Sequence, residues 1–299
     1  MGKASISLNG VFPPVPTPFD ADGNVAHGAL AENIEKLNAY ELAGYVVLGS
    51  NGEGVYLSRE EKVSVWETAR QVIPADKLLI AGTGCESTLQ ATALTAQAAD
   101  AGADAALILT PHYYGGQMTG DALTRHFETI ADRSSIPVVL YNMPRFTHVD
   151  MDAATVSRIA HHPNIIGIKD SGGNVGKLAQ IIGAREDGFQ VLAGSAGFFF
   201  PALTVGATGG VMALANILPQ ALIDLYDLFK EQRWEEAAAL QRRLVPLNTA
   251  VTSGFGVPGL KTAMNWLGYQ GGFVRSPLRA LNGRELQALR AVMTEGGVL

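Results

Sequence analysis

The chain has 299 residues, of which 47% are hydrophobic and 17% charged, and its formal net charge is −6. This length allows one large α/β barrel or two ordinary domains. The acidic balance and the lack of a basic block argue against nucleic acid as the main partner. No apolar stretch approaches the roughly 18 residues needed to cross a bilayer, so no membrane association is expected.

The cysteine content and the N-terminal sequence favour a cytoplasmic protein. Cys85 is the one cysteine, which excludes an intrachain disulfide and suits a reducing compartment. The first seven residues lack the apolar core of a signal peptide. A cytoplasmic location is therefore expected.

Strand-like and helix-like segments alternate along most of the chain. Strands are predicted over residues 11–17, 44–48, 78–82, 105–110, 137–141, 165–169, 190–194 and 209–212. Helices are predicted between them over residues 29–40, 59–72, 89–101, 121–132, 153–161, 175–185 and 198–205. Ser58 and Glu61 have the spacing of a capping box at the start of the second helix.

Only helical patterns follow the eighth strand, over residues 220–231, 234–250, 259–267 and 283–294. This order predicts a (β/α)₈ TIM barrel over residues 1–219, followed by a C-terminal helical region over residues 220–299. A doubly wound sheet is the alternative. It is disfavoured because Gly82 and Gly84 supply only the first two glycines of a dinucleotide-binding turn, and Ser87 stands where the third would fall.

Lys169 ends an apolar run, residues 164–169, that is typical of a buried strand. Burial of an ammonium group is costly and favours the neutral amine. A neutral amine at a strand end can attack a carbonyl carbon and form a Schiff base. The alternative is a side chain that extends past the strand into solvent.

Other polar groups follow the predicted strands where a barrel has its chemistry, at the carboxyl ends. The residues concerned are Ser50 and Asn51, Tyr113 and Tyr114, Tyr141, Ser171, and Gly194 and Ser195. Each has a plainer interpretation: residues 49–52 could be a simple turn rather than a carboxylate-binding loop, and the tyrosines could be packing residues. Their gathering around one predicted mouth favours the catalytic interpretation of Lys169.

No spacing of histidine and carboxylate residues matches a known metal motif, so neither a metal nor another cofactor is expected. Cys85 is interpreted as a small buried hydrophobic residue rather than a nucleophile.

With these motifs in place, the chain resembles the family of dihydrodipicolinate synthase and N-acetylneuraminate lyase, the class I Schiff-base aldolases. The resemblance covers nearly the whole chain. It rests on residues 49–53 (Gly-Ser-Asn-Gly-Glu), 110–114 (Thr-Pro-His-Tyr-Tyr), 141–144 (Tyr-Asn-Met-Pro) and 167–171 (Gly-Ile-Lys-Asp-Ser). Further runs, such as residues 84–88 and 190–198, most resemble the 4-hydroxy-2-oxoglutarate aldolase branch.

The resemblance implies a role for each residue. Lys169 would be the Schiff-base lysine and Tyr141 the proton-shuttling tyrosine. Ser50 and Asn51 would bind the carboxylate of a 2-oxo acid, and Ser50 would also relay protons. Tyr113 would reach across a subunit contact, which implies a homo-oligomer, either a dimer or a dimer of dimers. The predicted substrate-binding set is completed by Ser171, Gly194, Ser195 and Arg145.

One departure bears on the reaction. The lysine-biosynthesis branch of the family has an arginine where this chain has Phe146, with Arg145 one residue earlier. We therefore expect cleavage of a 4-hydroxy-2-oxo acid, with 4-hydroxy-2-oxoglutarate giving pyruvate and glyoxylate. The first alternative is 4-hydroxy-tetrahydrodipicolinate synthase, which condenses pyruvate with aspartate semialdehyde. The second is a non-catalytic protein that binds a 2-oxo acid.

Overall fold

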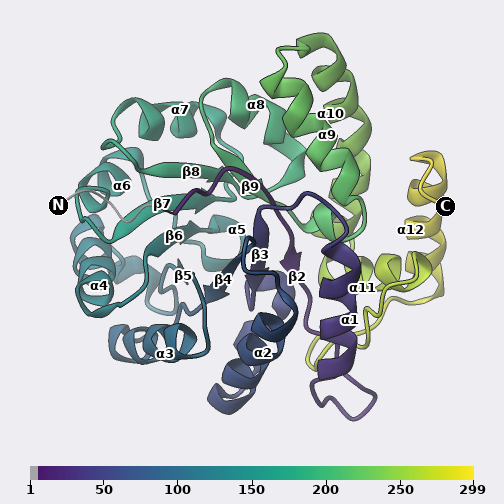
Figure 1. Cartoon of the computed structure of the whole chain (residues 1–299), viewed down its shortest axis with the longest axis horizontal. Helices are drawn as coiled ribbons and strands as arrows, with labels where there is room; N and C mark the ends of the chain where they lie inside the picture. The colour runs from purple at the N-terminus through teal and green to yellow at the C-terminus, as the bar shows by residue number, and fades with distance from the viewer. Residues whose placement is uncertain (1–5) are drawn as a thin grey trace.

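The computed structural model describes residues 6–299, in which parallel strands alternate with helices around a central barrel (Figure 1). All the strands belong to one sheet with the order β1-β9-β8-β7-β6-β5-β4-β3-β2. They are β1 (Gly10–Phe12), β2 (Pro14–Val15), β3 (Gly44–Val47), β4 (Leu78–Gly82), β5 (Ala105–Leu109), β6 (Val138–Asn142), β7 (Ile165–Asp170), β8 (Gln190–Ala193) and β9 (Gly209–Val211). The predicted (β/α)₈ barrel is confirmed.

The strand predicted over residues 11–17 is wrong in its extent, because it consists of two short strands separated by Pro13. Proline has no N–H to donate and therefore interrupts a ladder of hydrogen bonds. β1 pairs with β9, whereas β2 pairs with β3. Because β1 and β2 follow one another in the chain, they together occupy one strand position of the barrel. The barrel closes at this position, since β1 pairs with β9 and β2 pairs with β3.

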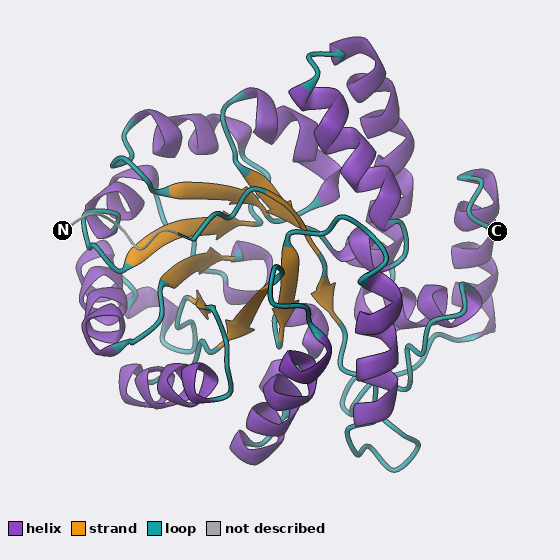
Figure 2. Ribbon diagram, in the orientation of Figure 1, coloured by secondary structure: helices purple, strands orange, loops and turns teal. Residues whose placement is uncertain are grey.

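Helices form a layer outside the strands, as Figure 2 shows by the purple ring around the orange sheet. The helices of this part are α1 (His27–Leu37), α2 (Arg59–Val72), α3 (Thr88–Asp100), α4 (Gly120–Arg133), α5 (Pro144–Thr147), α6 (Ala153–Ile159), α7 (Val175–Gly183) and α8 (Phe199–Thr204). The capping box predicted at α2 is confirmed, with Ser58 accepting from the Glu61 N–H and the Glu61 carboxylate accepting from the Ser58 N–H.

The C-terminal part is helical, as expected. It contains α9 (Pro219–Lys230), α10 (Trp234–Thr249), α11 (Gly256–Trp266) and α12 (Gly283–Glu295). A π-helical turn, Ala250–Gly254, joins α10 to α11. Because α9 packs on β1 of the barrel, the domain boundary placed after residue 219 stays a prediction.

The apolar core has two parts. One fills the barrel interior and includes Phe12, Leu107, Val139 and Tyr141. The larger part lies between the sheet and the helices. A parallel sheet buried on both faces explains why the strands read as nearly continuous apolar runs. Within residues 6–299, no helix is long and apolar enough to cross a membrane.

Candidate active site

Lys169 and Tyr141 lie side by side on neighbouring strands inside the barrel. They are register partners of the β6–β7 pair, and the Lys169 Nζ lies 3.8 Å from the centroid of the Tyr141 ring. Lys169 is 3% exposed and Tyr141 4%. The expectation that Lys169 is buried is therefore confirmed, and the alternative of a lysine extending into solvent is wrong.

A β-bulge in β7 turns Lys169 inward. Val138 pairs with Ile165 but Val139 pairs with Gly167, so one extra residue lies between the two pairs. Side chains alternate between the faces of a strand, and an extra residue reverses the alternation beyond it. Without the bulge, Lys169 would face the helices. Gly167 permits it, because a Cβ there would lie 2.4 Å from the Gln190 carbonyl oxygen.

The Tyr141 hydroxyl has three polar neighbours. The Ser50 Oγ lies 3.2 Å away, and hydrogen bonds also join Tyr141 to Lys169 and Ser171. Burial alone would raise the pKa of Tyr141. The positive charge of Lys169 and the three hydrogen bonds outweigh that effect, and the pKa lies below the ordinary value of a tyrosine. A tyrosine with a lowered pKa is suited to proton transfer near neutral pH.

The loop that carries Ser50 and Asn51 has a constrained backbone. It forms a 3₁₀ turn, η1 (Ser50–Gly52), that begins two residues after Leu48, whose φ is 61°. Few non-glycine residues adopt such an angle, and those that do cluster at functional sites. The Thr17 hydroxyl donates to the Gly52 carbonyl oxygen at 2.7 Å and holds the turn against β2.

Asn51 offers an unused hydrogen-bond donor beside Ser50. Its side-chain Nδ2 is buried and has no hydrogen-bond partner among residues 6–299. A buried donor without a partner is costly, and such groups usually serve a ligand. This geometry suits the carboxylate-binding role predicted for Ser50 and Asn51.

Ser171 and Gly194 meet below the Tyr141 hydroxyl. The Ser171 Oγ donates to the Gly194 carbonyl oxygen at 3.4 Å, and the Gly194 N–H donates to the Asp170 carbonyl oxygen at 2.8 Å. A Cβ at Gly194 would lie 2.0 Å from the Ser171 Oγ. Gly194 therefore leaves room for the Ser171 side chain, and the structure shows this steric role for it.

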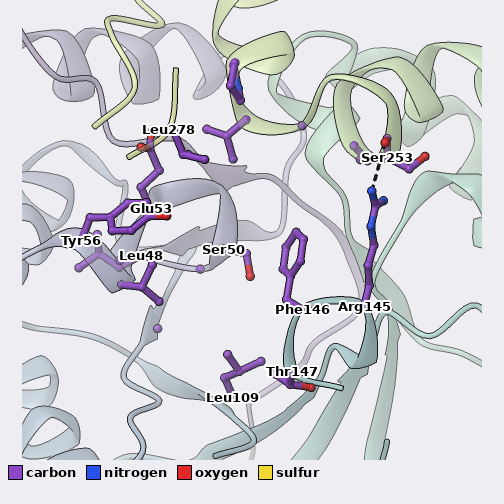
Figure 3. A pocket seen from close by; sticks show the side chains of 18 of the residues that line it. Leu48, Ser50, Glu53, Tyr56, Leu109, Arg145, Phe146, Thr147, Ser253 and Leu278 are labelled. Atoms are coloured by element: carbon purple, nitrogen blue, oxygen red, sulfur yellow. Dashed lines mark hydrogen bonds between the residues drawn. The ribbon is translucent and has the colours of Figure 1, made fainter. Parts of the chain in front are cut away.

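A cavity of about 710 Å³ opens above these residues and is lined by Ser50 and Tyr141. Its far wall includes Arg145 and Phe146, both on α5, a short helix that the sequence analysis did not predict. Figure 3 shows the Phe146 ring near Ser50, while Arg145 extends past it and donates through Nη2 to the Ser253 carbonyl oxygen at 3.1 Å. Arg145 thus lines the cavity with part of its guanidinium engaged.

Two predicted site residues lie apart from this group in the single chain. Ser195 is bonded to Asn248 of α10 and caps a 3₁₀ turn by accepting from the Gly197 N–H. Tyr113 is 77% exposed and packs edge-on against Tyr114. Neither is bonded to Tyr141, and neither lines the cavity, from whose lining Lys169, Asn51, Ser171 and Gly194 are also absent. A catalytic role for Tyr113 therefore depends on a second subunit.

The sequence analysis missed two buried lysines near the site. Lys177 is 8% exposed and pairs with Asp150 and Asp170. Lys261 is 2% exposed and pairs with Glu53, which lines the cavity. A signal was available for Lys261, since the helical spacing places it on the same face as apolar residues of α11. Among the described residues, no group of histidine, cysteine and carboxylate side chains could hold a metal ion.

Comparison with known proteins identifies the family. The model of the dihydrodipicolinate synthetase family matches residues 7–295. The chain belongs to this family. Its members are pyruvate-dependent Schiff-base lyases and synthases, and the prediction that the chain is an enzyme of this class is confirmed.

Individual relatives cover almost the whole chain. The 4-hydroxy-tetrahydrodipicolinate synthase of Methanothrix thermoacetophila is 38% identical over 289 residues, or 96% of this chain and 97% of the relative. The crystal structure of dihydrodipicolinate synthase from Bacillus anthracis has a TM-score of 0.93 at 30% identity and covers 97% of this chain and 98% of that one. A prophage protein of the same family from E. coli K12, solved in complex with pyruvate, has a TM-score of 0.92 at 28% identity, with 98% and 99% covered.

These names bear on the choice between branches. The curated relatives support the synthase, which was the first alternative, better than the 4-hydroxy-2-oxoglutarate aldolase, which was put first. The resemblance to the family is confirmed, whereas the assignment to the aldolase branch is not specifically supported.

Proposed function

We propose that this enzyme condenses pyruvate with an aldehyde through a Schiff base on Lys169, and that the reaction is that of 4-hydroxy-tetrahydrodipicolinate synthase. The observation that carries the chemistry is the buried Lys169–Tyr141 pair beneath the cavity. The names of the curated relatives support aspartate semialdehyde as the aldehyde.

The first half of the cycle forms a nucleophile. The Lys169 amine attacks C2 of pyruvate, and Tyr141 gives a proton to the departing oxygen, which leaves as water and produces an iminium. Ser50 and Asn51 hold the pyruvate carboxylate with the hydroxyl and the unused amide donor. The Tyr141 phenolate then takes a proton from C3, which converts the iminium into an enamine and restores the Tyr141 hydroxyl.

The second half makes the carbon–carbon bond. The enamine carbon attacks the aldehyde carbon, and the aldehyde oxygen takes a proton from Tyr141, which Ser50 can resupply along their 3.2 Å contact. Water hydrolyses the new iminium, or in the synthase reaction the amino group of aspartate semialdehyde displaces the lysine nitrogen from C2 and closes the ring. Either step frees the product and restores the Lys169 amine. Cleavage of a 4-hydroxy-2-oxo acid is the same sequence in reverse.

A second candidate is the cleavage of 4-hydroxy-2-oxoglutarate, and Phe146 is the observation that favours it. The ring is 53% exposed at the cavity wall, where the resemblance puts an arginine in the synthase branch, and Arg145 is bonded to the Ser253 carbonyl oxygen. A carboxylate against a phenyl ring would lack a charge-assisted hydrogen bond worth roughly 1.5–3 kcal/mol. 4-Hydroxy-2-oxoglutarate also has a distal carboxylate, so both reactions are compared in Phe146→Arg.

Two measurements test the proposal, one for the Schiff-base mechanism and one for the choice between condensation and cleavage. Borohydride reduction in the presence of pyruvate should attach a three-carbon adduct to Lys169, found by mass spectrometry, and Lys169→Ala should abolish both adduct and turnover. An unmodified Lys169 would contradict the mechanism. The values of kcat/KM for condensation and for cleavage, in wild type and in Phe146→Arg, then assign the branch. The synthase assignment requires that wild type favour condensation.

A further inference from the structure

A group of charged and polar side chains, buried except for Asp150, adjoins Lys169 and Tyr141 on the outer face of the sheet. We call Asn142, Asp150, Asp170 and Lys177 the strand-end cluster. Asn142 directly follows Tyr141 on β6, Asp170 directly follows Lys169 on β7, and the two are register partners. Both are 0% exposed. Since side chains alternate along a strand, Asn142 and Asp170 face the helices while their neighbours face the barrel interior.

The hydrogen bonds of the strand-end cluster connect β6 to β7. The Asn142 Nδ2 donates to the Asp170 Oδ2 at 2.8 Å and to the Asp150 Oδ1 at 2.7 Å, and its Oδ1 accepts from the Met151 N–H at 3.0 Å. The Lys177 Nζ, from α7, reaches the Asp150 Oδ1 at 2.5 Å and the Asp170 Oδ2 at 2.9 Å. One amide and one ammonium therefore bind both carboxylates.

Lys177 remains a cation in this setting. Burial would lower its pKa, but the hydrogen bonds and charges of Asp150 and Asp170 raise it above the ordinary value of a lysine. The buried Asp170 carboxylate thus has a permanent counter-charge. Removal of Lys177 would leave the buried Asp170 carboxylate without a counter-charge, which is strongly destabilising, whereas removal of Asp170 would leave Lys177 paired with Asp150.

Asp170 also orders the loop after β7. Its Oδ1 accepts from the Gly172 N–H at 2.8 Å, and the Ser171 N–H donates to the Asn142 carbonyl oxygen at 2.9 Å. Ser171 is one of the residues that bond to Tyr141. The strand-end cluster therefore joins the residues that directly follow Tyr141 and Lys169 and holds the loop that supplies Ser171.

The bulge in β7 gives a reason for a side-chain bond between β6 and β7. The register of β6 against β7 slips by one residue at Val138, only three residues before Tyr141. Beyond the bulge, β6 and β7 could also pair in a register shifted by one residue. Such a shift would turn Lys169 out of the barrel. A side-chain bond between Asn142 and Asp170 forms in the observed register.

We propose that the strand-end cluster is a positioning device that fixes Lys169 and Tyr141 in the geometry needed for proton transfer. This inference rests on the proposed function. Its residues touch no substrate and act through the pair that they hold. Misplacement of reacting groups by about 1 Å can cost up to about 100-fold in rate.

The test uses a reaction that needs no second substrate. Formation of the enamine exchanges the C3 protons of pyruvate with solvent, so NMR in deuterium oxide gives kcat and KM for the exchange. The variants are Asp170→Asn and Lys177→Met. The matched control is Leu178→Ala, which removes a fully buried apolar side chain from the same helix and none of the hydrogen bonds or ion pairs of the strand-end cluster. Thermal melting records the loss of stability in each.

We expect both variants to lose about 10- to 100-fold in kcat, with KM for pyruvate within threefold of wild type and the borohydride adduct still formed on Lys169. Leu178→Ala should melt earlier yet keep its kcat. If either variant does not fold, Asp170→Asn combined with Lys177→Met leaves no unpaired buried charge and is judged by the same criterion.

Two results would overturn the inference alone. They are a kcat within twofold of wild type, or an equal loss of kcat in Leu178→Ala. If the wild-type protein shows neither exchange nor adduct, the proposed function fails and the inference fails with it.

Discussion

Tyr141 is held between Lys169 and two hydroxyl groups, and each of these affects its proton affinity. Lys169 and Ser50 both favour the phenolate, which outweighs the cost of burial and lowers the pKa of Tyr141. The same contacts give the hydroxyl a fixed direction. At this scale the site has the two properties that acid–base catalysis requires, a suitable pKa and a position within hydrogen-bond reach.

The substitution Tyr141→Phe should separate these properties from packing. The phenyl ring still fills the barrel interior, so the melting temperature should change little. The rate of deuterium exchange into pyruvate should fall by about 10²–10⁴-fold, the usual contribution of a positioned acid or base. An exchange rate within twofold of wild type would make Tyr141 a packing residue.

The substitution Ser50→Ala should move the pH dependence of kcat in a known direction. Ser50 lowers the pKa of Tyr141, so its removal raises that pKa. If Tyr141 acts as a base, the ascending limb of the profile moves to higher pH, and if it acts as an acid, the descending limb moves to higher pH. In both roles the affected limb of the pH profile therefore moves to higher pH. Ser64→Ala, which removes a hydroxyl bonded to the Glu61 carbonyl oxygen on α2, is the control and should leave the profile unchanged. A limb that moves to lower pH would contradict the assignment.

Among the elements, α11 is joined to the Ser50 loop by a buried ion pair. The Lys261 Nζ reaches the Glu53 Oε1 at 2.5 Å and donates to the carbonyl oxygens of Thr17 and Phe273 at 2.7 and 2.6 Å. Glu53 has a φ of 53° and accepts from the Arg275 N–H at 2.9 Å. Burial lowers the pKa of Lys261 despite the opposing effect of Glu53. The C-terminal part thus supports the loop that lines the cavity.

Replacement of Lys261 by methionine should leave Glu53 buried without its partner. Loss of one member of a buried pair typically costs about 3–5 kcal/mol in the free energy of unfolding, which chemical denaturation measures. Adding Glu53→Gln to the same chain should recover part of the loss. Lys36→Met is the control, because the Lys36–Glu32 pair is 42% exposed on both sides and should contribute little. An equal effect of the two lysine substitutions would refute this interpretation of the ion pair.

The strands were predictable because a barrel buries both faces of its sheet, and apolar runs bounded by glycine or proline mark such strands. The bulge in β7 was not predicted, although Gly167 inside a strand pattern is a known sign of one. It decides which way Lys169 faces, so the burial of Lys169 was predicted correctly without its cause. The α5 helix was missed because four residues are too few to show helical periodicity.

The residues of the candidate site were also predicted only in part. Lys169, Tyr141, Ser50 and Ser171 were predicted from their positions at strand ends and are together in the structure. The partners of the buried lysines were not predicted, because Lys177 and Lys261 contact carboxylates that lie 7 to 208 residues away in the chain. Lys261 and Glu53 meet only through the packing of α11 on the Ser50 loop, and Lys177 meets Asp170 through the path of the loop between β7 and α7, neither of which a periodic pattern reveals.

For the whole molecule, the loop after β5 has a hydrogen-bonded backbone but exposed aromatic side chains. The Glu86 carboxylate accepts from the N–H groups of His112 and Tyr113 at 2.9 and 2.8 Å. Tyr113 is nevertheless 77% exposed and Tyr114 71%. Ordered aromatic groups at a surface lose little conformational freedom on binding and are enriched at protein interfaces. This agrees with the proposal that the enzyme is a homo-oligomer.

The combined substitution Tyr113→Ala and Tyr114→Ala should therefore weaken self-association, which sedimentation velocity measures over a range of concentrations. Aromatic residues at interface centres commonly cost at least about 2 kcal/mol when truncated, or about 30-fold in the dissociation constant. If Tyr113 also completes the site of a neighbouring subunit, kcat should fall in the concentration range where the variant dissociates and recover where it associates. Trp234→Ala, at another exposed aromatic residue on α10, is the control for a general effect of aromatic loss. A variant that associates like wild type would show that these tyrosines lie outside any subunit contact.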